Sequence, residues 1–202
     1  MKLVLASSNH GKLEELRSLL GDSGIELIAQ SDMGVDDAEE NGLTFVENAL
    51  IKARHAARLT GLPALADDSG ICVDALQGAP GLYSARYAGE HGNAGRNIDK
   101  LLQDLADVPD DARGAHFYCV LVLLHHADDP QPLIVEGQWS GRILRERRGT
   151  GGHGYDPVFF DPGYNQSAAE MPLSLKNGLS HRSKALAMLK QRLDGIAPLP
   201  RG

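Results

Sequence analysis

Short apolar runs alternate with amphipathic segments in the first half of the chain, and this alternation constrains the fold more than any other feature. Residues 2–6 are an apolar run, and leucines within residues 13–20 then recur at helical spacing opposite a polar face. Further apolar runs follow at 25–29, 64–66 and 71–75. Strands that alternate with helices are typical of α/β proteins with a largely parallel sheet, so we predict this class for the first half.

The second half carries a different pattern. Residues 115–124 and 133–142 are long apolar or alternating runs separated by a polar turn, which predicts an antiparallel hairpin. Leucines within 186–193 indicate a terminal helix. Together the two halves predict an α/β fold with a mixed twisted sheet, flanking helices and two lobes. At roughly 150 residues per domain, we expect residues 1–202 to be a single two-lobed domain.

Charge and hydropathy exclude several classes of protein. The formal net charge is −7 and the sequence pI is about 5.6, which argues against a broad nucleic-acid-binding surface. The longest apolar run, 117–124, is eight residues long against the ~20 that span a bilayer, and the first run turns polar at Ser7, too early for a signal peptide. We therefore expect a cytoplasmic protein that binds neither a membrane nor a nucleic acid polymer. Cys72 and Cys119 lack metal-ligand spacing, so we expect buried thiols.

A polar segment between the first predicted strand and helix is a candidate phosphate site. Backbone N–H groups and the positive end of a helix dipole point at such a loop, which suits a phosphate group. A P-loop is excluded, because its pattern requires Gly at the position of Ala6 and Ser or Thr at that of Leu13. A different phosphate-binding loop and an ordinary polar turn both stay open. The segment consists of Ser7, Ser8, Asn9, His10, Gly11 and Lys12.

A lysine on the apolar face of the next predicted helix indicates a buried ion pair or a phosphate contact. Thr44 and Glu47 form a capping box, and the helix that they start ends at Gly61. At 100° per residue, Lys52 falls on the apolar stripe of this helix. Such a lysine either extends along the surface to reach water or pairs with an anion. The acids that the sequence offers as partners are Glu40, Asp67 and Asp68.

Two adjacent carboxylates, Asp67 and Asp68, directly follow the apolar run 64–66. Functional sites in open α/β sheets gather at the carboxyl ends of strands. Adjacent carboxylates indicate a hard cation, a shared proton or an exposed turn. Combined with a phosphate loop and an inward-facing Lys52, they favour a phosphoryl-transfer reaction assisted by Mg²⁺.

Two segments of the second half are candidate nucleotide contacts. Glycines gather at 149–154, where they allow a flat or anionic ligand to approach the backbone, and His153 and Tyr155 could stack on a base. A flexible connector is the alternative. Lys176 and residues 180–183 stand before the last predicted helix, where cations oppose the helix dipole, so an anionic or carbonyl-bearing partner explains them better than helix stability. A solvated loop remains the alternative for this segment.

In this order, the segments resemble the inosine triphosphate pyrophosphatase family, of the Ham1 or RdgB type, nearly end to end. The resemblance implies Mg²⁺-dependent hydrolysis of deaminated purine nucleoside triphosphates (dITP, ITP and XTP) to the monophosphate and pyrophosphate, which cleanses the nucleotide pool. It also implies a mixed α/β fold with a cleft between two lobes, and a homodimer. The elements that carry it are Ser7-x-Asn9-x-x-Lys12, Glu39-Glu40-x-Gly42-x-Thr44-Phe45-x-Glu47-Asn48-Ala49, Lys52-Ala53, Ala66-Asp67-Asp68-Ser69-Gly70, Gly78-Ala79-Pro80-Gly81-x-x-Ser84-Ala85-Arg86, Gly151-Gly152-x-Gly154-Tyr155-Asp156-Pro157 and Ser180-His181-Arg182.

The resemblance implies a role for each matching residue. Asp68 would be the catalytic base with Lys52 beside it, and Glu40 and Asp68 would hold Mg²⁺. The segment from Ser7 to Lys12 would hold the triphosphate. The family commonly has Phe where this chain has His153, which changes the strength and pH dependence of stacking on the base. The residues that would contact the nucleotide are Ser69, His153, Gly154, Tyr155, Asp156, Lys176, His181 and Arg182.

Two other functions stay open on the sequence. One is a pyrophosphatase for another modified nucleotide, as in the related Maf-type proteins, whose signature residues are not assembled in this chain. The other is a nucleotide-binding regulator without catalysis, which would not need Glu40, Lys52 and Asp68 together. Their joint presence favours an enzyme. We expect water to attack the α-phosphorus so that pyrophosphate leaves.

Overall fold

The protein is described by a computed structural model over residues 2–8, 10–20 and 24–194. Asn9 of the predicted phosphate segment lies outside these ranges. The strands are β1 (Lys2–Leu5), β2 (Glu26–Ala29), β3 (Ala64–Val73), β4 (Gly114–Leu124), β5 (Leu133–Ile143), β6 (Phe159–Asp161) and β7 (Gln166–Ser167). The α-helices are α1 (His10–Leu20), α2 (Phe45–Thr60), α3 (Ala94–Asp104), α4 (Leu173–Leu179) and α5 (His181–Asp194).

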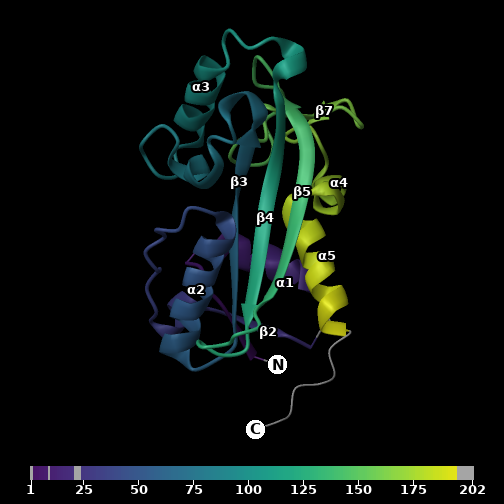
Figure 1. Cartoon of the computed structure of the whole chain (residues 1–202). Coiled ribbons are helices and arrows are strands. Elements are labelled where there is room, and N and C mark those ends of the chain that lie inside the picture. The colour runs from purple at the N-terminus through teal and green to yellow at the C-terminus, as the bar shows by residue number, and fades with distance from the viewer. Residues whose placement is uncertain (1, 9, 21–23, 195–202) are drawn as a thin grey trace. The chain divides into compact units, whose positions relative to one another are not determined.

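The strands form one mixed seven-stranded sheet in the order β2-β1-β3-β4-β5-β6-β7. β1 pairs in parallel with both β2 and β3, and β6 pairs antiparallel with both β5 and β7. β4 and β5 are neighbours joined by residues 125–132, a connection too short for parallel strands. Figure 1 shows these two strands as long arrows side by side. The predicted α/β class, the mixed sheet and the hairpin are confirmed.

The chain divides into two compact units. Unit 1 comprises Met1–Asp68, Cys119–Gly137 and Arg182–Gly202, and unit 2 comprises Ser69–Tyr118 and Gln138–His181. The long strands β3, β4 and β5 contribute residues to both units. Each unit has a hydrophobic core of its own. The cleft that the family resemblance implies stays a prediction.

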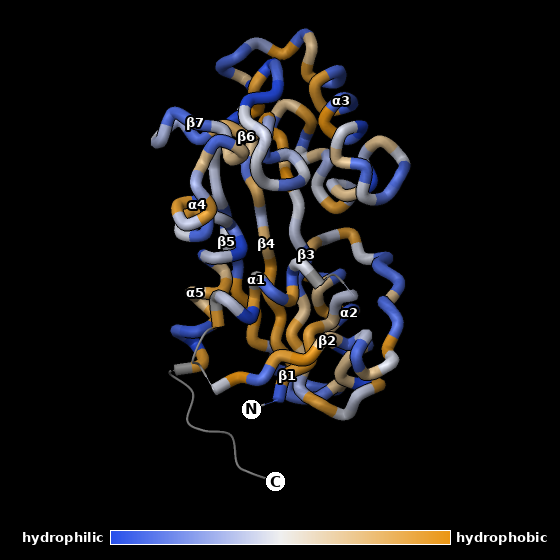
Figure 2. Tube along the Cα trace, turned by 180° about the vertical axis from the view of Figure 1, so that it is seen from behind, coloured by the Kyte–Doolittle hydropathy of each residue, from blue (hydrophilic) through white to orange (hydrophobic). Residues whose placement is uncertain are grey.

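The core of unit 1 shows which face of the sheet each strand residue occupies. Leu3 and Leu65 belong to the same buried cluster as Leu16 of α1 and Leu186 of α5. Because side chains alternate between the two faces of a strand, the odd-numbered residues of this part of β3 face α1 and α5. The even-numbered residues face the opposite side, where α2 contacts β1. Figure 2 shows β1 and β2 in hydrophobic colours at the centre of this unit.

Aromatic rings pack against one another in the core of unit 2. The ring centroid of Phe117 lies 4.6 Å from that of Phe159 and 6.2 Å from that of Trp139. The indole Nε1 of Trp139 donates a hydrogen bond to Asp161 Oδ2 at 2.8 Å, so the one polar atom of this buried ring is satisfied.

The main difference from the sequence prediction lies in residues 64–75. The sequence predicts two short strands around a polar turn, whereas β3 is one strand of ten residues that passes through Asp67 and Asp68. A 3-10 turn at Asp74–Leu76 then occupies the end of the second predicted strand. The prediction was wrong because adjacent carboxylates favour an exposed turn unless the fold neutralises them. Cations from neighbouring helices do so here.

Two helices begin earlier than predicted. α1 starts at His10, so Gly11 and Lys12 lie in its first turn rather than in the loop before it. α5 starts at His181, so Arg182 also lies inside the first turn of a helix. Both starts carry cations that oppose the helix dipole, which is why the sequence alone places the boundaries later.

The remaining expectations concern the membrane and the cysteines. Within the described ranges, no helix is long and apolar enough to cross a bilayer. Neither Cys72 nor Cys119 forms a disulfide in the described part of the chain; Cys119 is buried, as expected, whereas Cys72 is only half-buried.

Candidate active site

A buried carboxylate, Asp67, lies between two cations of unit 1. Its Oδ1 accepts a hydrogen bond from Lys12 Nζ of α1 at 2.7 Å. Its Oδ2 lies 3.4 Å from Nε and 3.3 Å from Nη2 of Arg182 in α5. Burial raises the pKa of Asp67, but the charges of Lys12, Arg182 and Lys52 outweigh burial and hold this pKa well below its usual range. Asp67 is therefore ionised and fixes the positions of Lys12 and Arg182.

Asp68 belongs to a second cluster, around Lys52 of α2. Lys52 Nζ lies 2.9 Å from Asp68 Oδ1 and 3.2 Å from Glu40 Oε1. Burial raises the pKa of Asp68, and although Lys52 opposes this shift, Glu40 and Asp67 add to it. For Lys52, burial lowers the pKa, but Asp68, Asp67 and Glu40 more than compensate, so its pKa is raised. The inward position of Lys52, expected from helical periodicity, is confirmed, and of the two alternatives left open for it the ion pair is the one observed.

The alternation of β3 explains why two adjacent carboxylates serve two different clusters. Asp67 is odd-numbered and faces α1 and α5, which carry Lys12 and Arg182. Asp68 is even-numbered and faces the side of α2, which carries Lys52. The two carboxylates therefore point away from each other, and each forms ion pairs with its own cations.

The start of α2 holds the acidic segment near Lys52. Thr44 Oγ1 accepts a hydrogen bond from the Glu47 backbone N–H at 3.2 Å, and Glu47 Oε2 accepts one from the Leu43 N–H at 2.8 Å, which confirms the capping box. The Gly42 N–H donates to Oδ1 of the buried Asn48 at 2.9 Å. A Cβ at Gly42 would lie 2.7 Å from the Cβ of Glu47, so the chain can pass this close only as glycine. Glu40 is two residues away from this anchor.

The predicted phosphate segment connects β1 to α1, as expected. The Ser7 N–H donates to the Leu5 carbonyl at 2.9 Å, and Ser8 Oγ donates to Asp37 Oδ2 at 2.5 Å. His10 and Gly11 open α1, whose first turn also carries Lys12. The first N–H groups of any α-helix lack partners within the helix, so this turn offers donors next to the Lys12 ammonium.

In unit 2 the glycine-rich segment is anchored by Asp156. This buried carboxylate accepts hydrogen bonds from Lys176 Nζ and, at 2.8 Å, from the His153 backbone N–H. A Cβ at Gly152 would lie 2.1 Å from Asp156 Oδ2, and the φ of Gly152 is +72°, so only glycine fits here. Asp156 and Lys176, both expected to touch the nucleotide, form an ion pair with each other.

Tyr155 belongs to the core of unit 2. It is buried, and its hydroxyl donates to the Ser84 carbonyl at 2.7 Å. Burial raises the pKa of this phenol above its usual range. The surroundings favour a role for Tyr155 in supporting the segment rather than in stacking on a base.

Three further residues of unit 2 were predicted to contact the nucleotide, and their surroundings differ from one another. His153 is exposed next to Gly154, and Ser69 is a half-buried residue of β3. The ring of His181 stacks on Phe117, with 5.1 Å between centroids and 14° between planes. Phe117 thus fixes the orientation of the imidazole. The sequence analysis missed Phe117 because it reads as an ordinary strand residue.

The residues present fit a Mg²⁺ ion, although they supply only two carboxylates. Among the described residues, no group of three or more His, Cys, Asp and Glu side chains is arranged to hold a metal ion. Glu40 and Asp68 nevertheless converge on the same Lys52 ammonium. Mg²⁺ commonly takes one or two carboxylates from the protein and completes its coordination with water and substrate phosphates. This pair supplies that number.

Fold and site together define an α/β protein with a centre of buried carboxylates paired with lysine and arginine side chains. The model of the Ham1 family matches residues 3–192. A HAM1 protein from Coxiella burnetii has a similar solved structure, with a TM-score of 0.93 and 49% identity over 97% of this chain and 100% of that one. The chain belongs to the Ham1 family.

Several similar proteins are named for an enzymatic activity. A protein from Shigella flexneri named dITP/XTP pyrophosphatase is 59% identical over 95% of this chain and 98% of its own length. A protein of the same name from Escherichia coli strain K12 is 57% identical over the same shares. A solved Mycobacterium abscessus structure, described as nucleoside-triphosphatase / dITP/XTP pyrophosphatase, has a TM-score of 0.79 and 44% identity over 94% of this chain and 98% of that one.

Proposed function

We propose that this chain hydrolyses deaminated purine nucleoside triphosphates, dITP, ITP and XTP, to the monophosphate and pyrophosphate. Relatives that match almost their whole length carry the name dITP/XTP pyrophosphatase. The observation that carries the proposal most directly is the division of the acidic pair between two clusters. One carboxylate holds two cations in place, and the other is a buried carboxylate with a raised pKa beside a lysine.

The geometry supports a division of labour among the residues of unit 1. Lys12 and the first turn of α1 bind the triphosphate through charge and backbone N–H groups. Asp68 accepts a proton from the attacking water, and Lys52 orients its carboxylate. The raised pKa of Asp68 makes the carboxylate a better proton acceptor than an exposed one. Attack at the α-phosphorus releases pyrophosphate as the leaving group.

The proposal includes a metal, a second subunit and a location. Glu40 and Asp68 would hold Mg²⁺, which supplies positive charge to phosphoryl oxygens when bound. We also propose that the two units act as one domain, and that the protein is a cytoplasmic homodimer. Sedimentation at several protein concentrations tests the dimer, and cell fractionation tests the location.

A product assay with a nucleotide panel tests the activity. The purified chain is incubated with dITP, ITP, XTP, ATP and GTP, with Mg²⁺ or with EDTA, and pyrophosphate and orthophosphate are measured separately. We expect pyrophosphate from the deaminated purines only, and only with Mg²⁺. Orthophosphate as the direct product would overturn the α-phosphorus mechanism. Preference for a different modified nucleotide would indicate a Maf-type substrate, and binding without turnover a regulator.

Arg182 is expected to contribute to base selection. Held by Asp67 in the first turn of α5, its guanidinium is a fixed hydrogen-bond donor that suits a purine 6-oxo group and rejects a 6-amino group. A mismatched buried donor typically costs ~1–3 kcal/mol, so Arg182→Ala should lower the ITP to ATP ratio of kcat/KM by about 5- to 150-fold. His181→Ala should lower the same ratio. An unchanged ratio in Arg182→Ala, with folding verified by circular dichroism, would remove Arg182 from base recognition.

A further inference from the structure

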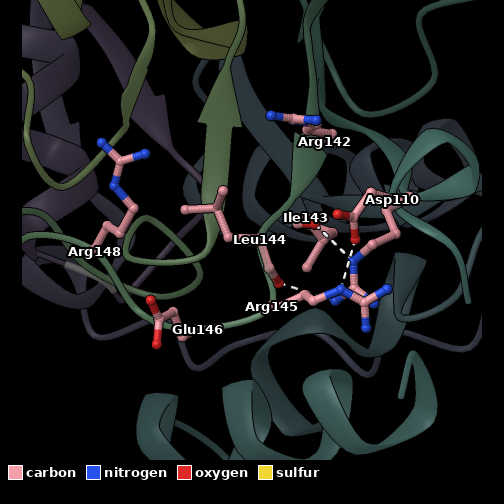
Figure 3. A pocket seen from close by; sticks show the side chains of 8 residues that line it. Asp110, Arg142, Ile143, Leu144, Arg145, Glu146 and Arg148 are labelled. Carbon is pink, nitrogen blue, oxygen red and sulfur yellow. Dashed lines mark hydrogen bonds and ion pairs between the residues drawn. The ribbon is translucent and has the colours of Figure 1, made fainter. Parts of the chain in front are cut away.

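Unit 2 contains an arginine-lined pocket that shares no residue with the candidate active site. Its volume is about 430 Å³, and its charged lining residues are Asp110, Arg113, Arg142, Arg145, Glu146 and Arg148 (Figure 3). Four guanidinium groups against two carboxylates give the lining a formal charge of +2, in a chain whose net charge is −7. Positive charge is therefore concentrated here against the trend of the whole molecule.

Arg142 has hydrogen-bond donors to offer a ligand. It lies opposite Phe160 in the β5–β6 pair, and its guanidinium carbon is 4.8 Å from the centroid of that buried ring. Within the described ranges, the guanidinium of Arg142 makes no hydrogen bond or ion pair. In Figure 3 it points away from the Asp110–Arg145 pair. The ring thus holds the guanidinium by its face and leaves its N–H edges for an anion.

Arg148 contacts the same aromatic ring. Its guanidinium carbon lies 5.5 Å from the Phe160 centroid, and its Nη2 lies 3.3 Å from Glu170 Oε1. Phe160 therefore anchors two guanidinium groups, which reduces the side-chain freedom that a ligand would have to remove.

Arg113 and Arg145 add positive charge at the wall of the pocket. Arg113 is 2% exposed and donates to the carbonyls of Leu105, Ile143 and Leu144 at 2.6, 2.8 and 2.9 Å. Asp110 pairs with Arg145 at 2.6 Å, and Arg113 has no ion pair of its own within the described residues. Burial and the charge of Arg145 lower the pKa of Arg113, and the charge of Asp110 opposes this shift only in part. An anion in the pocket would add to the negative charge of Asp110 and further stabilise the guanidinium of Arg113.

We propose that this pocket binds a small phosphate-bearing anion, with Arg142 as its direct contact. Guanidinium groups match phosphate oxygens with two parallel hydrogen bonds, and the volume lies within the ~300–1,000 Å³ typical of small-ligand sites. Inorganic pyrophosphate and a nucleoside monophosphate share this chemistry. The inference does not depend on the proposed function, because it rests on residues to which that function assigns no role.

Backbone amide NMR of the full chain tests the pocket directly. The protein is titrated with inorganic pyrophosphate, with inosine monophosphate, with sulfate and with a short single-stranded oligonucleotide at constant ionic strength. Arg142→Gln removes the proposed contact, and Lys12→Ala removes a cation of the candidate active site. Arg147→Gln is the matched control, because Arg147 is on the same segment, pairs with Asp99 and does not line the pocket.

We expect pyrophosphate or the monophosphate to shift the amides of Ile143 and Leu144 with saturation, and sulfate to do so at least about tenfold more weakly. Arg142→Gln should weaken this binding about tenfold or more, whereas Arg147→Gln and Lys12→Ala should leave it unchanged. Whichever of pyrophosphate and the monophosphate binds more tightly shows which of these two classes of ligand the pocket prefers. The proposal is overturned if these amides do not shift, if Arg142→Gln binds as the native chain does, or if the oligonucleotide binds more tightly than both probes.

Discussion

Asp68→Asn should reduce pyrophosphate release from dITP by about 100- to 10,000-fold, which is the usual contribution of a general base. The amide cannot accept a proton from water, yet it has nearly the same shape. Lys52 keeps Glu40 at 3.2 Å as a partner, so the fold should survive. Steady-state kinetics and thermal unfolding measure the two effects. Asp36→Asn is the matched control, because Asp36 is an exposed acid of the same unit.

A second substitution shows whether Asp68 and Lys52 act together. Residues that act as one catalytic unit have non-additive effects, so Lys52→Met combined with Asp68→Asn should be little slower than Asp68→Asn alone. If the rate losses of the two single variants multiply in the double variant, Lys52 acts independently of Asp68, for example by contacting the substrate. Should Asp68→Asn retain activity within about tenfold of the native chain, Asp68 is not the base.

Asp67→Asn should lower the free energy of unfolding by about 3–5 kcal/mol, because removing one partner of a buried ion pair leaves the other charge uncompensated. Asp67 is buried, and it binds both Lys12 and Arg182. Urea unfolding followed by circular dichroism measures the loss. Adding Lys12→Met removes one stranded cation and should recover part of it. A loss below about 1 kcal/mol, as for an exposed pair, would contradict the buried geometry.

In the folded fraction of the protein, Asp67→Asn should raise KM more than it lowers kcat. Asp67 does not touch the water or the phosphorus in the proposed mechanism. It positions Lys12 and Arg182 through its two oxygens, so its loss should weaken substrate binding first. Asp67→Glu keeps the charge and serves as the conservative comparison.

The pH dependence of stability gives an independent check on Asp67. Its pKa is lowered in the folded protein, so it binds fewer protons there than in the unfolded chain. Its stabilising contribution should be fully present above the unfolded value of about 3.9 and should fall as the pH drops toward the folded pKa. In EDTA, the difference in unfolding free energy between the native chain and Asp67→Asn should shrink over that acidic range.

Local patterns were sufficient for much of the secondary structure. The capping box at Thr44 and the spacing of apolar residues predicted α2 and the inward position of Lys52, because helix geometry depends on residues three and four apart. Alternating runs predicted the β4–β5 hairpin, because successive side chains of a strand point to opposite faces of the sheet. Local patterns did not predict that β3 continues through Asp67 and Asp68. Lys12 and Arg182, the cations that neutralise Asp67, come from helices distant in sequence.

The sequence by itself determined the α/β class, the family resemblance and which acids and cations were worth examining. Only the tertiary structure decided how they pair, because ion pairs depend on the faces that strands and helices present to one another. The alternation of β3 assigns Asp67 to Lys12 and Arg182, and Asp68 to Lys52. Burial likewise decided that Tyr155 supports a core and that Arg113 is surrounded by carbonyls. Burial results from packing the whole chain, which no single segment specifies.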